Sequence, residues 1–202
     1  MTSHSATDVL VAVEAAWVAA FGPVGSRGSV SFVGVASIEV LRFGPDDAGT
    51  VRYTTVGMAR TSMTDPTDVV VDSVSAPRAE LVLTLSEHQD SVLRTMAALA
   101  SAPVVEGLVV APDATVDIGQ PLWDGAGFTA VIVGEPELPE VVSGASEPVR
   151  LLPVVPITAT ELAYRRIHGA AALREAWREA GTDLHATIRR GSSGRPSRRQ
   201  GE

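Results

Sequence analysis

The side chains that most often carry out catalysis or bind metals are few in this sequence and lie far apart. Its four histidines are His4, His88, His168 and His185, and no two stand at a spacing typical of shared metal ligation. The chain has no cysteine, which excludes disulfides and thiol catalysis, and no G-x-S-x-G motif that would present a serine nucleophile. We therefore predict no metal site, no cofactor and no catalytic centre.

Acidic residues are more numerous, but most of them stand singly in predicted turns. Asp65, Asp68 and Asp72 could offer clustered oxygens to a hard cation, yet their segment lacks the glycine and the terminal glutamate of an EF-hand, and we predict no site there. An alternative function is an enzyme with a carboxylate-based site at Glu80, near the Gly57–Met58 turn, because functional groups often gather in loops at strand ends.

The overall composition is typical of a globular protein. Of 202 residues, 45% are apolar and 20% are charged, and this length is enough to bury a core without disulfides. No apolar run reaches the roughly 18–20 residues that span a bilayer, and the first residues lack the basic start of a signal peptide. We expect a cytoplasmic protein without a membrane partner.

Charge is unevenly distributed along the chain. The formal net charge is −8, but residues 189–202 hold five arginines and one acid, which leaves eleven arginines against 23 acids in the rest. We predict a single domain over residues 1–186 and a disordered, arginine-rich tail over residues 187–202. A regulator that binds nucleic acid through Arg189–Arg199 is a further alternative, which the acidic body disfavours because it would repel phosphates.

Apolar residues at helical spacing predict four helices. They fall between Thr7 and Gly22, between Ser86 and Pro103, between Thr158 and Gly169, and from there to Gly181. Ser86 with Gln89, and Thr158 with Glu161, each match a capping box, in which a side chain at the helix start and one three residues later bond each other's backbone.

Apolar stretches bounded by turn residues predict the strands. They lie at about 30–42, 51–58, 79–85, 128–133 and 150–155, with a short one at 69–71. The first two should form a hairpin, and Gly22, Gly25 and Gly28 predict a flexible turn before it. Helices and strands that are mixed in this way indicate an α+β protein.

Several segments, taken in order, resemble the suppressor-of-fused family. The similar segments are Thr54–Met58 with Met63–Pro66 (a strand ending in a Gly-Met turn), Arg78–Leu83 (an Ala-Glu-Leu strand), Ala111–Phe128 (a loop and the next strand) and Val155–Leu162 with Gly169 (a helix that follows a proline). Together they cover about residues 30–180. Family members often carry a His and an Asp where this chain has Ser37–Leu41, so no role of those two residues carries over.

The resemblance implies a mixed, largely antiparallel sheet flanked by helices, with no known catalytic centre. In animals the domain holds an extended peptide of a Hedgehog-pathway transcription factor, and bacterial relatives are expected to be immunity proteins against polymorphic toxins. It thus implies a non-catalytic protein-binding module, either an immunity protein that neutralises a toxin or a regulatory adaptor. Its partner would be another protein, either a toxin domain or an extended peptide, and an acidic body suits a basic toxin.

For the partner-binding residues we predict Met58, Met63, Glu80 and Trp123, at the exposed edge of a cleft. Methionine adapts to varied partners, and tryptophan offers a large contact area. The competing interpretation is that the methionines fill the core and that Trp123, in a loop rich in Pro and Gly, packs against it. The oligomeric state is not defined by the sequence.

Overall fold

One mixed sheet organises the computed structural model, which describes residues 2–64, 76–144 and 147–189. Its seven strands follow the order β1-β2-β3-β4-β7-β6-β5. They are β1 (Val24–Val30), β2 (Ile38–Phe43), β3 (Val51–Val56), β4 (Arg78–Leu85), β5 (Thr115–Asp117), β6 (Phe128–Val133) and β7 (Val149–Thr158). Only β4 and β7 pair in parallel within this sheet, which confirms the predicted mixed, largely antiparallel α+β fold.

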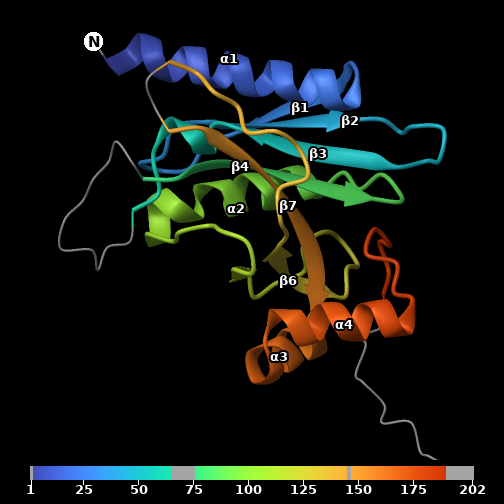
Figure 1. The fold of residues 1–202 in the computed structure, drawn as a ribbon. Coiled ribbons are helices and arrows are strands. Elements are labelled where there is room, and N and C mark those ends of the chain that lie inside the picture. The colour runs from blue at the N-terminus through green and yellow to red at the C-terminus, as the bar shows by residue number, and fades with distance from the viewer. Residues whose placement is uncertain (1, 65–75, 145–146, 190–202) are drawn as a thin grey trace, which may run out of the picture.

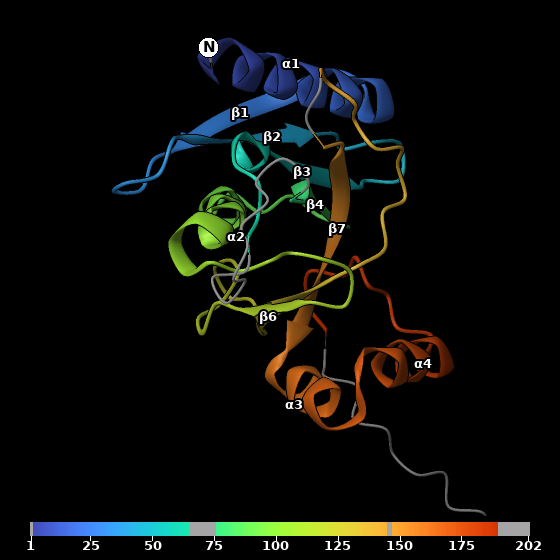
Figure 2. The same ribbon diagram turned by 60° about the vertical axis from the view of Figure 1, so that its left-hand side comes forward.

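The helices cover the two faces of the sheet unequally (Figures 1 and 2). They are α1 (Thr2–Phe21), the 3-10 turn Met58–Arg60, α2 (Val92–Glu106), α3 (Ala159–His168) and α4 (Ala170–Ala180). On one face α1 packs over β2 and β3, while α3 and α4 pack over β6 and β7. The opposite face packs against α2. The middle of the first face, between α1 and α4, therefore has no helix over it.

The alternation in β4 divides its side chains between these faces. Leu81, Leu83 and Leu85 join Met96 and Leu99 of α2 in the largest apolar cluster. Glu80, Val82 and Thr84, which alternate with these leucines, point to the face of α1 and α4, since successive strand residues point to opposite faces. This is the alternation predicted for residues 79–85. It determines which β4 side chains face the part of the sheet that no helix covers.

The local signals near the C-terminal helices are confirmed. Thr158 N donates to Glu161 Oε2 at 2.8 Å, and Glu161 N donates to Thr158 Oγ1 at 3.2 Å, so the capping box at the start of α3 is complete. Gly181 ends α4 in the left-handed conformation, with φ 61°. Strand β6 spans the predicted residues 128–133.

The predicted start of α2 is wrong by one and a half turns. The helix begins at Val92, and Ser91 precedes it without a side-chain cap. The backbone groups that a capping box would use have distant partners, because Ser86 N donates to His185 O at 2.8 Å and Gln89 N donates to Tyr53 Oη at 2.7 Å. The helix also continues through Pro103 to Glu106, beyond its predicted end.

The predicted glycine turn after α1 is a strand instead. β1 pairs antiparallel with β2, and a register shift separates Val24 from Ser26. Gly28 faces α2, where an added Cβ would lie 3.1 Å from Leu93 Cδ1. Glycine at this position allows α2 to pack closely on the edge strand β1. In the sequence alone, the same glycines indicate a flexible turn.

Several predicted features lie outside the described residues. They are the strand at 69–71, the set Asp65, Asp68 and Asp72, and residues 190–202 of the predicted tail. Within the described ranges, no helix is long and apolar enough to cross a membrane. Residues 187–189, at the start of the predicted tail, are described and contact the body, as shown below.

Candidate functional site

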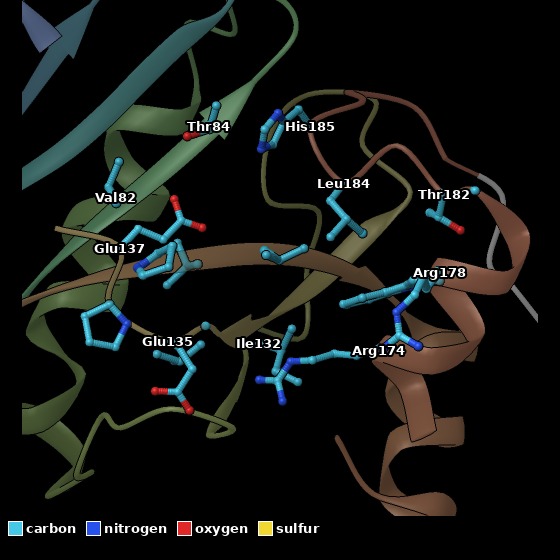
Figure 3. A pocket seen from close by; sticks show the side chains of 18 residues that line it. Val82, Thr84, Ile132, Glu135, Glu137, Arg174, Arg178, Thr182, Leu184 and His185 are labelled. Atoms are coloured by element: carbon cyan, nitrogen blue, oxygen red, sulfur yellow. The ribbon is translucent and has the colours of Figure 1, made fainter. Parts of the chain in front are cut away.

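A groove crosses the part of the sheet that no helix covers, and Figure 3 shows its larger cavity, which lies beside α4. The groove consists of one cavity of about 560 Å³ and an adjoining one of about 150 Å³. The two share five lining residues, which are Val82, Thr84, Glu137, Pro153 and His185. We call the two cavities together the sheet groove; the smaller one extends it to Phe21, at the end of α1.

The floor of the sheet groove is mostly apolar because it is the outward side of the central strands. Val82 of β4, Ile132 of β6 and Val155 of β7 all lie there. At its edge Gly134 N donates to Pro153 O at 2.8 Å, and an added Cβ on Gly134 would meet Pro153 Cγ at 3.0 Å. The glycine thus lets the loop after β6 leave the sheet while staying close to the floor.

The two walls of the sheet groove carry opposite charges (Figure 3). Glu135 and Glu137 lie on the loop after β6, and Arg174 and Arg178 lie on α4. The arginines are already engaged, Arg174 with Asp113 and Arg178 with Glu175. The two glutamates are exposed and form no ion pair with any described residue. The charge left uncompensated at the groove is therefore negative.

An arm of the chain after α4, residues 182–189, closes one end of the groove. Contacts of His185, Thr187 and Arg189 hold this arm on the body of the protein. His185 O accepts from Ser86 N, and buried Thr187 donates to Glu87 Oε2 at 3.3 Å. Arg189 then pairs with Glu161 of α3, with N···O distances of 3.2 Å to each carboxylate oxygen. The side chains of this pair are 6% and 0% exposed.

Arg189 sits in a site built for a guanidinium. Its guanidinium carbon lies 5.0 Å from the ring centre of Phe128 and 5.4 Å from that of Trp177, and it also donates to Pro156 O. Burial raises the pKa of Glu161, but hydrogen bonds from Thr158 and Trp177 and the charge of Arg189 outweigh it and hold that pKa below its usual value. The arm wall is thus fixed to α3 by a charged, desolvated contact.

The four residues predicted to form an exposed binding edge are all buried, so that part of the prediction is wrong. The exposed fractions are 4% for Met58, 3% for Met63, 0% for Glu80 and 4% for Trp123. Trp123 packs on Phe128, with ring centres 5.3 Å apart, and Met63 accepts a hydrogen bond from Val110 N. The four belong to the interior rather than to the sheet groove, and a role in partner binding stays a prediction.

Glu80 is buried because it organises the turn after β3. Its Oε1 accepts from Gly57 N at 2.7 Å and from Ala59 N at 3.0 Å, and its Oε2 accepts from Thr55 Oγ1 at 2.6 Å. Burial raises the pKa of Glu80, and these three hydrogen bonds oppose that rise without cancelling it. Both carboxylate oxygens are thus occupied by the protein, so the carboxylate named in the enzyme alternative is not accessible to a substrate.

Within the described part of the chain, no group of three or more His, Asp or Glu residues is placed to hold a metal ion.

The residues that line the sheet groove were not predicted from the sequence. The one sequence signal for them was the outward half of the alternation in 79–85, which places Val82 and Thr84 opposite the core side of the strand.

Comparison with known proteins shows which family the chain belongs to. Residues 34–190 match the family model described as suppressor of fused protein (SUFU). The chain belongs to the suppressor-of-fused family. The match ends one residue after Arg189, so it includes the arm of residues 182–189. A comparison with curated proteins found no match.

Solved structures show that the suppressor-of-fused fold extends over nearly the whole chain. A homologue from Neisseria gonorrhoeae FA 1090 has a TM-score of 0.65 at 17% identity, covering 95% of this chain and 98% of that one. The Sufu–Fu complex gives 0.63 at 11% identity, covering 93% and 92%. Drosophila Suppressor of Fused gives 0.64 at 11% identity and covers 93% of this chain but 51% of that one. At these identities the likeness concerns the fold.

Proposed function

We propose that this protein is a non-catalytic module that binds another protein through the sheet groove. The observation that carries this is the pairing of an apolar floor with two uncompensated carboxylates, Glu135 and Glu137. The fully buried centre of a protein interface is typically apolar, and complementary charge favours the correct partner and speeds association. The family supports the proposal, since one of its structures is a complex of Sufu with Fu.

The groove favours a partner segment that is basic and partly apolar. Apolar side chains would cover Val82 and Val155, while Lys or Arg side chains would pair with Glu135 and Glu137. A basic toxin domain has this chemistry, so within the proposal we favour an immunity protein in the cytoplasm over a regulatory adaptor. The excess of acids in the body would also speed association with such a partner.

Reversing the charge of Glu135 and Glu137 should strongly reduce capture of the partner. With the protein as bait in an extract of its source cell, we expect Glu135→Arg combined with Glu137→Arg to reduce the captured partner about tenfold or more, because like charges would then face each other. Glu106→Arg combined with Glu147→Arg is the control, since both residues are exposed, lie outside the groove and change the net charge equally. Equal capture by both double variants would refute binding at this groove.

Immunity and adaptor roles are separated by what the captured partner does. If the partner is a toxin, its expression alone should stop growth, and co-expression of this protein should restore it. The groove variant should fail to restore growth while the control variant succeeds. A captured partner that has no effect on growth would favour an adaptor.

One of the arginines named in the nucleic-acid alternative, Arg189, forms part of the folded body. Arg189 is buried against Glu161 and therefore cannot contact phosphates without leaving that pair. Truncation after residue 189 keeps the pair and removes the remaining arginines of the tail. Unchanged retention of DNA and RNA by the truncated chain, measured at fixed salt, would dispose of this alternative.

A further inference from the structure

A second, smaller cavity lies on the α2 face of the sheet, opposite the sheet groove. It has a volume of about 220 Å³ and sits at the corner formed by β1, β2, β3 and the start of α2. Its lining residues are Ser26, Arg42, Tyr53, His88, Asp90 and Leu93. We call it the Arg42 cavity. It shares no residue with the sheet groove, and the proposed function makes no use of it.

Arg42 is a cation without a partner in this cavity. Its Nε atom is buried and has no hydrogen-bond acceptor, and its guanidinium forms no ion pair with any described residue. Among the nearest surface arginines, Arg27 pairs with Glu14 and Glu39, and Arg52 pairs with Asp46. A desolvated N–H without an acceptor is costly, because its hydrogen bond to water is lost and not replaced. An anion in the cavity would supply an acceptor for the guanidinium, which lines it.

The other polar groups around Arg42 fit the same conclusion. Ser26 stands opposite Arg42 in the register of β1 and β2, so its hydroxyl reaches the same cavity. His88 stacks on Tyr53, with ring centres 6.3 Å apart, and its Nε2 lies 3.3 Å from Asp90 Oδ1. That contact leaves the second ring nitrogen of His88 for a ligand. The Tyr53 hydroxyl is already used, because it donates to Gln89 O and accepts from Gln89 N.

The single acid of the lining does not neutralise the site. Asp90 is the one acidic lining residue, and its side chain is 97% exposed, so water screens its charge. The start of α2 at Val92 adds the positive end of a helix dipole nearby. The cavity therefore combines a positive local charge with hydrogen-bond donors, in a body that is acidic as a whole.

We propose that the Arg42 cavity binds an oxyanion of the size of phosphate, carried by a small molecule. The planar guanidinium offers parallel N–H donors that match two oxygens of a phosphate or carboxylate, and Ser26 and His88 would bond the remaining oxygens. A volume of about 220 Å³ is below the range of about 300–1,000 Å³ that encloses drug-sized ligands, so the ligand enters as a small group.

Titration with inorganic phosphate tests this site directly. In amide and histidine NMR spectra of the full chain at constant pH and ionic strength, we expect saturable shifts confined to residues around the cavity, with sodium chloride giving none. Sodium acetate, titrated in parallel, distinguishes a phosphate from a carboxylate preference. Saturation by either oxyanion supports the site. Shifts that do not saturate over the whole titration, that sodium chloride reproduces, or that scatter over the surface would overturn it.

Substitution of Arg42 separates binding from folding. Arg42→Met keeps the aliphatic stem and should weaken oxyanion binding at least tenfold, while Arg94→Met, an exposed α2 residue outside the cavity, should leave it unchanged. Because Arg42→Met removes an unpartnered donor, its melting temperature in phosphate-free buffer should match or exceed that of the wild type. Should this variant fail to fold, Ser26→Ala serves in its place with a smaller loss. Unchanged oxyanion affinity in Arg42→Met, or in Ser26→Ala if Arg42→Met does not fold, would overturn the proposal.

Discussion

Replacing Arg189 with methionine should lower the free energy of unfolding by about 3 kcal/mol or more, because it leaves the carboxylate of Glu161 buried with its charge partner removed. Methionine keeps much of the apolar contact with Phe128 and Trp177, so the loss reports mainly on charge. Urea denaturation followed by circular dichroism measures the difference. The arm that forms one wall of the sheet groove should also become susceptible to protease.

Arg178→Met is the matched control for this prediction. Arg178 is on the same face of the molecule and pairs with Glu175, but that pair is exposed on both sides and three residues apart on one helix. Surface pairs of this kind contribute about 0–1 kcal/mol, so the control should be close to the wild type. A loss for Arg189→Met no larger than that for Arg178→Met would show that the buried pair does not hold the arm.

The pH dependence of this pair has a definite sign. Since the pKa of Glu161 is lowered in the folded protein, its contribution to stability is present above the unfolded value of 4.5 and is lost as the pH falls toward the lower folded value. The difference in stability between the wild type and Arg189→Met should therefore shrink below about pH 4.5. A difference that grows on acidification would contradict this assignment.

Replacing Glu80 with alanine should be at least as damaging, with an expected loss of about 3–5 kcal/mol in the free energy of unfolding. Three donors, Gly57 N, Ala59 N and the Thr55 hydroxyl, would remain buried without an acceptor. The turn that follows β3 would lose the group that holds it. Thermal and urea unfolding measure the effect, and the yield of soluble protein reports it if the variant does not fold.

Glu80→Gln is the informative comparison. The amide oxygen of Gln can accept from Gly57 N and Ala59 N, and its NH₂ can donate to Thr55 Oγ1, so this variant should retain most of the stability. Because the folded pKa of Glu80 is raised, the wild type should lose stability as the pH rises from 4.5 through that folded value, and the glutamine variant should not. Equal losses for alanine and glutamine would contradict this expectation, because they would show that an amide of the same volume does not replace the hydrogen bonds of the carboxylate.

The positions that carried the family resemblance are largely interior ones. Glu80 braces the Gly57–Met58 turn, and Trp123 packs on Phe128 under the loop. Such residues indicate a fold because they stabilise it from the interior. For the same reason, the motifs that contain them did not predict which residues form the exposed binding surface. The residues of the sheet groove carry no local signature, since Glu135 and Glu137 read as part of an ordinary surface loop.

By itself the sequence determined what depends on neighbours a few residues apart. The capping box of Thr158 and Glu161, the end of α4 at Gly181 and the two faces of β4 all follow from backbone geometry within one or two turns. Only the tertiary structure decided the start of α2, the strand β1 and the groove. Each of these depends on pairing between distant segments, above all β4 with β7, which lie about 70 residues apart along the chain. Local patterns fix which face of an element is apolar, but they contain no information about which distant element will cover it.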